Sequence, residues 1–397
     1  MKTAVKRKGT GEGLSTTCVH GGEMVDSLTG SVTTPIFQSA TFFYPYAVDS
    51  KGEYTDRSAP YFYTRLSNPT VRVVERKLSL MEGTDDAVAF ASGMAAISTA
   101  VLQVIGRKGH ILSVRDLYGG THSLFSEVLP DMGHEVTMFD RGSVCALESM
   151  IRENTRAVYV ETPTNPTLDI YDIEEVFRTA HANGLITIID NTFPSPVNLQ
   201  PAAIGADLVI HSATKYLGGH SDIIAGMVAG SGKLISGIRS MQSVLGGSMD
   251  PFAAFLLERG MKTLELRVRK QNENAMAIAE YLQGRREISR VLYPGLPAHE
   301  GHDIASRLMK GYGGMLSFEL KGGGKAAERF IKKLKIARVA ASLGGVESLV
   351  TIPATTSHRQ LSGSELRERG ISSGLVRFSA GIEDADDLIA DISRALG

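Results

Sequence analysis

The sequence predicts an α/β fold, in which a three-layer sandwich surrounds a mostly parallel β-sheet and a smaller α+β domain follows. Short apolar runs alternate with amphipathic stretches from residue 86 to residue 210. This alternation is typical of parallel strands joined by helices. Beyond Pro251 the character changes, and a long helical pattern leads into more widely spaced apolar runs. The length of 397 residues is sufficient for two domains.

The first sixty residues differ from the rest of the chain, because they carry little periodicity and are rich in Thr, Ser, Tyr and Pro. A long irregular segment in a compact protein is usually functional or wrapped on a partner. We therefore expect residues 1–64 to form an arm that lies on another subunit. A first domain over residues 65–262 and a C-terminal domain over residues 263–397 are expected to follow it.

Local signals place the elements of the first domain. A helix is predicted after Asn68, since the next residue is a proline, which is favoured at the first helical position, and Gly83 can close the helix. Asp172 with Glu175 indicates a capping box at the start of another helix, and Asn183 with the glycine after it indicates the end. Six apolar runs are predicted as strands: Ala87–Ala91, Ile111–Val114, Val136–Phe139, Ala157–Val160, Leu185–Ile189 and Leu208–Ile210.

The C-terminal part begins with one long helical pattern from Phe252 to Gln283, with a break near Gly260. This helix is expected to bridge the two domains. The strands predicted for the smaller domain lie near Ile288–Leu292, Gly314–Leu320 and Leu375–Ser379.

The composition excludes several classes of protein. The net charge of −1 leaves no footprint for nucleic acid or an anionic membrane, and no apolar run approaches the ~20 residues of a membrane span. Cys18 and Cys145 are the only cysteines, and the histidines form no convincing ligand set, so neither a disulfide framework nor a metal site is expected. The segment from Met1 to Gly13 lacks the apolar core of a signal peptide, and we expect a cytoplasmic protein.

Two neighbouring apolar runs lead into residues with catalytic potential. The first runs into Asp190, and the second runs into Ser212, Thr214 and Lys215. Ligands of open α/β sheets bind at the carboxyl ends of strands. Pyridoxal phosphate requires these groups: a lysine that forms a Schiff base with its aldehyde, a carboxylate that holds its ring nitrogen protonated, and hydroxyls for its phosphate. Alone, Lys215 is more typical of a surface and Asp190 of a helix cap, so the prediction depends on their combination.

Two further groups fit the same cofactor. Ser92, Gly93 and Met94 follow a predicted strand and open a helix, whose free N–H groups and dipole favour an anion such as a phosphate. Tyr118 precedes two glycines and is placed to stack on a ring and to pass a proton. The alternatives are an ordinary helix cap for Ser92 and a half-buried structural aromatic for Tyr118.

Two arginines have both a binding and a structural interpretation. Arg65 with Tyr63 suits a phosphate, or a surface ion pair. Arg377 places a charge inside an apolar strand, where arginine is rarely buried unless it is paired. Its partner is either a substrate carboxylate, which the guanidinium matches bidentately, or a C-terminal acid in a structural salt bridge.

These motifs, taken in order, resemble the Cys/Met-metabolism family of pyridoxal-phosphate-dependent enzymes. That family includes cystathionine γ-synthase, cystathionine γ-lyase, methionine γ-lyase and the O-acylhomoserine sulfhydrylases. The resemblance extends from Val19 to Asp384, and its most specific stretch is Asp207 to His220. Supporting stretches are residues 63–70, 161–166 and 342–345.

The resemblance implies fold type I and a cofactor-binding domain over residues 65–262. Lys215 would carry pyridoxal phosphate and shuttle protons, Asp190 would pair with the ring nitrogen, and Tyr118 would stack on the ring. The phosphate would be held by Ser92, Gly93, Met94, Ser212 and Thr214. Asn165, Ser342 and Arg377 would bind the substrate carboxylate or orient the aldimine.

The resemblance also implies an assembly, because Tyr63 and Arg65 would reach the cofactor of a neighbouring subunit. The protein would then be a homotetramer, built as a dimer of dimers with shared active sites. The substrate would be a small amino acid, with no nucleic acid or membrane partner.

The activity expected is γ-elimination on a sulfur-containing or related γ-substituted amino acid, which gives 2-oxobutanoate and ammonia. The alternative is γ-replacement on an O-acylhomoserine. Gly120 and Ala341 stand where methionine γ-lyases carry a cysteine and animal-type cystathionine γ-lyases an acid, which indicates a roomy or unusual pocket for the γ-substituent. An aminotransferase of the same fold and a cofactor-free scaffold are alternatives from other classes.

Overall fold

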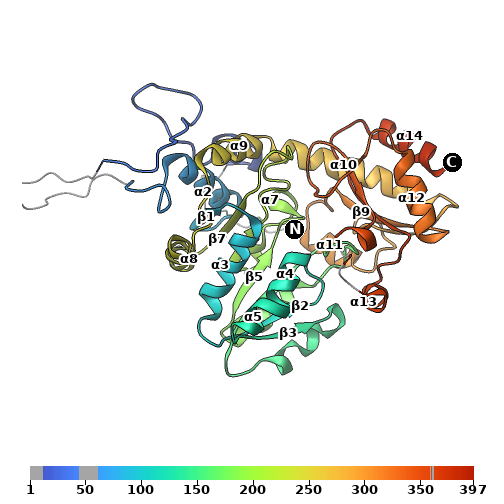
Figure 1. Ribbon diagram of the computed structural model, residues 1–397, viewed down its shortest axis with the longest axis horizontal. Coiled ribbons are helices and arrows are strands. Elements are labelled where there is room, and N and C mark those ends of the chain that lie inside the picture. The colour runs from blue at the N-terminus through green and yellow to red at the C-terminus, as the bar shows by residue number, and fades with distance from the viewer. Residues whose placement is uncertain (1–11, 44–60, 358, 360–361) are drawn as a thin grey trace, which may run out of the picture.

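The computed structural model describes residues 12–43, 61–357, 359 and 362–397. Figure 1 shows a large domain that contains the central sheet and a smaller C-terminal domain, with helix α10 (Leu264–Gln283) running between them. The predicted α/β class, with a mostly parallel sheet and a second, smaller sheet domain, is confirmed. Within the described ranges, no helix combines the length and apolarity needed to cross a membrane.

The central sheet has seven strands in the order β1-β7-β6-β5-β4-β2-β3. All neighbours are parallel except β7, which runs antiparallel between β1 and β6. The strands are β1 (Asp86–Phe90), β2 (His110–Val114), β3 (Glu135–Phe139), β4 (Thr155–Glu161), β5 (Ile186–Asp190), β6 (Leu208–His211) and β7 (Gly226–Gly230). The six predicted strands are present, and β7 is an additional strand that the sequence analysis did not predict.

The glycines at the two ends of β7 are required for steric reasons. A Cβ at Gly226 would lie 2.1 Å from the carbonyl oxygen of Ser92, and one at Gly230 would lie 2.6 Å from that of Asp207. Glycine at both ends therefore lets β7 approach its neighbours closely, at the expense of the β-branched composition that marks a strand.

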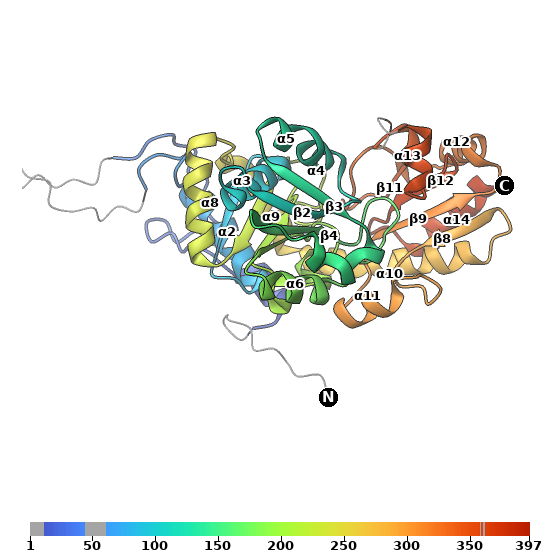
Figure 2. The same cartoon turned by 90° about the horizontal axis from the view of Figure 1, so that it is seen from below.

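Helices cover both faces of the sheet (Figure 2). Helices α3, α4 and α5 lie on one face and α6 lies on the other. Strand β1 shows the alternation that this requires: Val88 and Phe90 pack with the α3 core, whereas Ala87 and Ala89 pack with the α2 core. The helices of the large domain are α2 (Pro69–Glu82), α3 (Gly93–Ile105), α4 (Gly119–Ser123), α5 (Leu129–Asp131), α6 (Ile173–Ala182), α7 (Ser195–Asn198), α8 (Gly232–Leu245) and α9 (Pro251–Lys262).

Two helix ends differ from the predictions. Helix α6 begins at the predicted place, but no capping box forms: the Asp172 side chain makes no cap hydrogen bond, and instead accepts a bond from Arg307 at 2.6 Å. The long helical pattern is interrupted at Thr263 and not at Gly260. Gly260 lies inside α9, where a Cβ would come within 2.1 Å of the Gly218 carbonyl oxygen, so this glycine permits close packing.

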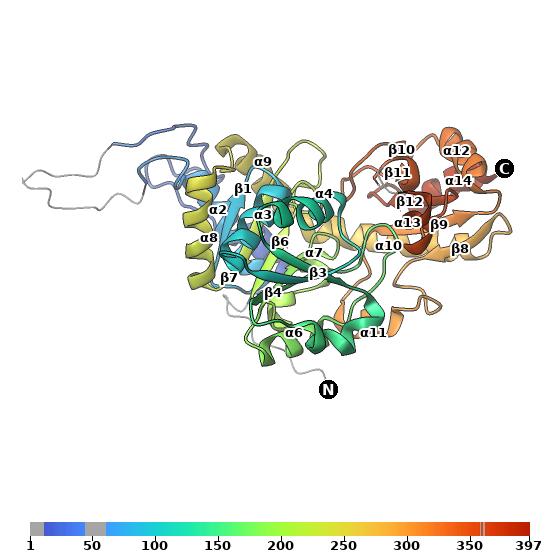
Figure 3. The ribbon, with the colours of Figure 1, turned by 60° about the horizontal axis from the view of Figure 1, so that its bottom comes forward.

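The C-terminal domain contains a five-stranded, mostly antiparallel sheet in the order β10-β11-β12-β9-β8. Figure 3 shows it beyond the large domain, with α12 and α14 near it. The strands are β8 (Ile288–Leu292), β9 (Met315–Leu320), β10 (Arg338–Val339), β11 (Leu349–Thr351) and β12 (Leu375–Ser379), and the helices are α11 (His302–Leu308), α12 (Gly323–Lys333), α13 (Gly363–Glu368) and α14 (Ala385–Leu396). The three predicted strands are present, and the short β10 and β11 are additional.

Among the described residues that precede α2, one short helix is present, α1 (Leu14–His20), which packs on α2, α9 and α10. The segment after it exposes large apolar side chains, with Val32 94% and Phe43 99% exposed. Residues 1–11 and 44–60 of the predicted arm lie outside the described residues.

Candidate active site

The predicted site residues gather where the central strands end. Strand β5 ends at Asp190 and the neighbouring β4 at Glu161, and these two residues are paired in register. The loop that leaves β6 carries Ser212 and Lys215. Parallel strands direct their carboxyl ends to the same edge of a sheet, so the fold itself brings these side chains together.

Lys215 lies half-buried between the two domains. Its Nζ donates a hydrogen bond to the Oγ of Ser342 at 2.8 Å. Burial, and secondarily the charge of Arg377, lowers the pKa of Lys215 to about 8. A lysine with such a pKa is available as a neutral nucleophile near physiological pH.

Asp190 is 6% exposed and accepts a hydrogen bond from the backbone N–H of Thr192 at 2.9 Å. Burial raises its pKa, although the hydrogen bonds from Thr192 and the charge of His211 oppose the rise. A cation beside Asp190, such as a protonated pyridine nitrogen, would stabilise the ionised carboxylate.

Glu161 is a site residue that the sequence reasoning did not single out. It is 6% exposed and accepts a hydrogen bond from the backbone N–H of Tyr118 at 2.8 Å. Burial, and then the nearby Asp190, raises the pKa of Glu161 well above its ordinary value. Its place at the end of the strand beside the one that ends in Asp190 was the available signal.

The first turn of α3 lies directly against Ser212, and we call these two segments the phosphate cradle. Ser92 caps this helix, and its hydroxyl accepts a bond from the backbone N–H of Ala95 at 3.1 Å. A Cβ at Gly93 would lie 3.1 Å from the Oγ of Ser212, so a side chain there would fill the cradle. The hydroxyl of Thr214 is engaged with the backbone of Ala225, at 2.9 Å and 3.2 Å.

These groups fit pyridoxal phosphate. The cradle supplies backbone N–H groups and a hydroxyl for the phosphate, and the buried Asp190 and the low-pKa Lys215 supply the groups for the ring nitrogen and the aldehyde.

Tyr118 immediately precedes α4, and its side chain is 49% exposed. A Cβ at Gly120 would lie 2.8 Å from the Sδ of Met94 and 2.9 Å from the Cε1 of Tyr118. The side chains of Met94 and Tyr118 therefore border Gly120 closely, and a side chain at this position would have to displace the flexible end of Met94.

Arg377 joins the site from β12 and is 6% exposed. Its guanidinium donates to the Oδ1 of Asn165 at 3.1 Å and to the carbonyl of Ser342 at 3.0 Å. Burial lowers its pKa to about 10. Among the described residues no carboxylate forms an ion pair with Arg377, which favours the substrate-carboxylate interpretation over a structural salt bridge.

Ser342 connects the two cations, since its hydroxyl contacts Lys215 and its carbonyl contacts Arg377. Its φ of +87° lies in the region that L-residues rarely adopt. Such strain is concentrated at functional sites, where the surroundings hold the residue in place.

Tyr63 and Arg65 lie elsewhere in the large domain. Arg65 stacks over the Tyr63 ring at 5.6 Å and donates a hydrogen bond to the carbonyl of Ser243 in α8. Tyr63 is 37% exposed. The subunit therefore does not bring this pair into contact with its own Lys215.

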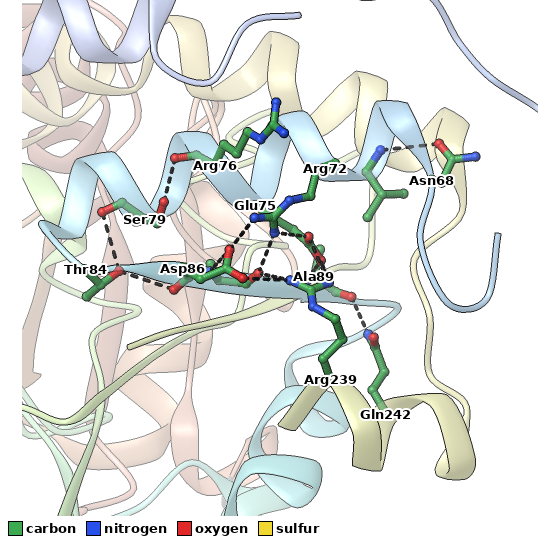
Figure 4. Close-up of polar contacts among 12 residues, drawn as sticks. Asn68, Arg72, Glu75, Arg76, Ser79, Thr84, Asp86, Ala89, Arg239 and Gln242 are labelled. Carbon is green, nitrogen blue, oxygen red and sulfur yellow. Dashed lines mark hydrogen bonds and ion pairs between the residues drawn. The ribbon is translucent and has the colours of Figure 1, made fainter. Parts of the chain in front are cut away.

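A buried ionic network fixes the strand that leads into the phosphate cradle (Figure 4). Glu75 of α2 accepts bonds from the backbone N–H of Ala89 and from Arg239 of α8, each at 3.0 Å. Gln242 donates to the carbonyl of Ala89 at 2.6 Å. Side chains thus supply hydrogen-bond partners for the backbone of Ala89 at the open edge of β1. These bonds anchor the strand and block its pairing with another chain.

The fold and this grouping of residues are those of a pyridoxal-phosphate-dependent enzyme. The family described as "Cys/Met metabolism PLP-dependent enzyme" matches residues 15–397. The chain belongs to this family, and pyridoxal phosphate is its cofactor.

Several characterised proteins are similar to the chain over almost its whole length. Cystathionine gamma-synthase 1, chloroplastic, of Arabidopsis thaliana is 42% identical over 381 residues, which cover 95% of this chain and 68% of that protein. L-methionine gamma-lyase of Fusobacterium nucleatum subsp. polymorphum is 40% identical over 387 residues, covering 97% and 98%. Cystathionine beta-lyase of Lactococcus lactis subsp. cremoris (strain MG1363) is 42% identical over 385 residues, covering 96% and 98%. The crystal structure of metB from Corynebacterium glutamicum superposes with a TM-score of 0.90 at 41% identity, covering 97% and 98%.

These relatives confirm the predicted class of activity, a lyase or transferase reaction of methionine and cysteine metabolism. Within that class they match γ-elimination or γ-replacement.

Proposed function

We propose that the protein is a γ-lyase, which eliminates the γ-substituent of a methionine- or cystathionine-type amino acid and yields 2-oxobutanoate and ammonia. The observation that supports this most is the contact of Ser342 with both Lys215 and Arg377. It places a proton-accepting amine beside a buried guanidinium that suits an α-carboxylate. A substrate held there presents its Cα to Lys215.

Binding comes first in the proposed mechanism. Arg377 pairs with the substrate carboxylate, and Asn165 holds the guanidinium in orientation. When pyridoxal phosphate is bound, the first turn of α3 and the Ser212 hydroxyl would hold its phosphate, together with Ser92, Met94 and Thr214. Asp190 would pair with its protonated ring nitrogen.

Proton transfer then follows from the chain's own groups. Bound pyridoxal phosphate supplies an electron sink that makes the Cα proton acidic. Lys215, whose pKa of about 8 leaves part of the amine neutral near physiological pH, accepts that proton at Nζ while Ser342 orients it. The hydroxyl of the half-exposed Tyr118 serves as acid or base near the γ-substituent, and Glu161 fixes the backbone of Tyr118.

We also propose a homotetramer made of two dimers with shared sites. The Tyr63–Arg65 pair, remote from its own Lys215, would reach the phosphate of the neighbouring subunit's cofactor. Several apolar side chains that one subunit leaves almost fully exposed, most of them within residues 25–43, support a protein partner that covers them. They include Val25, Leu28, Val32, Phe43 and Val244. The molecular mass of the particle in solution tests the tetramer. The domain boundaries and the cytoplasmic location given above stay predictions.

γ-Replacement on an O-acylhomoserine is the second candidate, favoured by the 42% identity with a γ-synthase. Purified, cofactor-loaded protein should be offered methionine, O-acetylhomoserine and O-succinylhomoserine, each with and without a thiol. 2-Oxobutanoate from methionine without a thiol supports the γ-lyase. A thioether formed only from an acylhomoserine and a thiol moves the protein to the synthase or sulfhydrylase branch.

Substrate choice within the family is expected to depend on Gly120 and Ala341. The double variant Gly120→Cys with Ala341→Glu should change the ratio of rates on methionine and cystathionine, because the new side chain at 120 must displace Met94. An unchanged ratio contradicts this expectation.

A further inference from the structure

Helix α10 carries a buried polar stripe, which we define as Arg267, Gln271 and Asn274. Their spacing of four and three residues places them on one face of the helix. They are 4%, 0% and 0% exposed. The mechanism proposed above uses none of them.

Each member of the stripe donates to backbone carbonyls of a different loop. Arg267 donates to the carbonyl of Tyr216 at 2.8 Å and to that of Gly260 at 2.7 Å. Gln271 donates to the carbonyl of Gly345 at 2.7 Å. The first loop directly follows Lys215, and the second directly follows Ser342.

Asn274 extends the stripe to the strand that carries Arg377. Its Nδ2 donates to the carbonyls of Gly381 and Glu383, at 3.0 Å and 2.7 Å, just beyond the end of β12. Figure 1 shows α10 running from α9 of the large domain to α14 of the small one. One helix therefore bonds to all three segments that supply the Lys215–Ser342–Arg377 contact.

Close packing at the Lys215 loop makes this anchoring specific. A Cβ at Gly219 would lie 1.9 Å from the Nη1 of Arg267, so the loop backbone lies directly on the guanidinium. The two anchored loops also bond to each other, since the backbone N–H of Val346 donates to the carbonyl of Gly219 at 3.0 Å.

The stripe costs stability that an apolar face would not. Among the described residues, the Oε1 of Gln271 and the Oδ1 of Asn274 have no hydrogen-bond partner. Burying a half-satisfied amide is unfavourable compared with burying an aliphatic side chain of similar volume. The hydrogen bonds from the stripe therefore fix the positions of the loops, and they lower the free energy of unfolding relative to an apolar face.

We propose that the Arg267–Gln271–Asn274 stripe is a positioning device that sets the distance between Lys215 and the carboxylate-binding pair Ser342 and Arg377 across the two domains. The assignment of the carboxylate to Arg377 rests on the proposed function. The stripe residues touch neither substrate nor cofactor, and act through the loops that they hold.

The test separates the two loops with the variants Gln271→Met and Arg267→Met in the cofactor-loaded protein. Glu273→Gln, on the exposed side of the same helix, is the matched control. Hydrogen–deuterium exchange should increase in the peptide around 342–346 for Gln271→Met and in the peptide around 216–220 for Arg267→Met. This readout requires no substrate, so a wrong assignment of the γ-lyase activity leaves it intact.

The two variants should also affect different steps, with Gln271→Met acting mainly on ligand binding and Arg267→Met mainly on catalysis. Gln271→Met is expected to weaken the binding of glycine, read from the visible spectrum of the bound cofactor, by about tenfold. With a turned-over substrate, it should raise KM more than it lowers kcat. Arg267→Met is expected to shift the pH dependence of the cofactor absorbance and to lower kcat.

Gln271→Asn keeps the amide on a shorter side chain, and should show the same pattern more weakly if Gln271→Met does not fold. Exchange that rises equally in both loops, or glycine binding that matches the Glu273→Gln control, would overturn the proposal.

Discussion

Replacement of Arg377 by methionine should weaken substrate binding strongly while leaving the fold almost as stable as before. Burial lowers the pKa of Arg377 well below its ordinary value, to about 10, which corresponds to roughly 3 kcal/mol of unfavourable free energy in the folded state. Its two donated bonds, to Asn165 and Ser342, return about 3 kcal/mol at ~1.5 kcal/mol per charged hydrogen bond. The two contributions nearly cancel, and the net change in unfolding free energy should stay below about 2 kcal/mol.

Activity should respond very differently, because an α-carboxylate bound by Arg377 loses its charged partner. Truncating one member of a buried, hydrogen-bonded charge pair costs about 2–5 kcal/mol, so kcat/KM should fall by roughly 30- to 5,000-fold. Thermal melting and steady-state kinetics on the same preparation measure both effects. Arg338→Met, at an exposed position in β10, is the matched control. A large drop in melting temperature with unchanged kcat/KM would show that Arg377 is a structural residue and refute the reasoning.

Further predictions concern the cofactor site. The rate at which cofactor-free protein captures pyridoxal phosphate should rise with pH and be half-maximal near the Lys215 pKa of about 8, since the neutral amine is the nucleophile. Stopped-flow absorbance measures this rate, and a rate that does not change with pH contradicts the prediction. Glu161→Gln should be nearly silent, because burial favours the neutral acid and an acceptor for Tyr118 remains, whereas Glu161→Leu should lower kcat by about tenfold. Equal kinetics for the two variants would exclude this role. Gly93→Ala should weaken cofactor binding by at least about tenfold, measured by equilibrium dialysis, because its Cβ would lie 3.0 Å from that of Ser212. Unchanged affinity would remove the phosphate from this cradle.

The sequence predicted the fold well where structure follows from local pattern. The parallel strands are continuous apolar runs, and Asn68 caps its helix as expected, accepting from the N–H of Thr70. Strand β7 was not predicted because its glycines are required by close contact with the backbones of other segments, which the local sequence does not reveal. The capping box at Asp172 failed because Arg307, distant in sequence, takes the carboxylate.

The candidate site shows the same division. Lys215, Asp190 and Arg377 could be proposed because each lies on or just after an apolar strand, a position visible in sequence. The bond from Tyr118 to Glu161 and the anchoring of loops by Gln271 depend on tertiary packing, which no local pattern encodes.

The keto acid that the cofactor-loaded protein releases from cystathionine, without added thiol, distinguishes a γ-lyase from the alternatives. We expect 2-oxobutanoate with an equal amount of ammonia, and none from the Lys215→Ala variant. Pyruvate as the main product would mean cleavage at the β-carbon. The absence of any keto acid, together with thioether formation from an acylhomoserine and a thiol, would also contradict the γ-lyase.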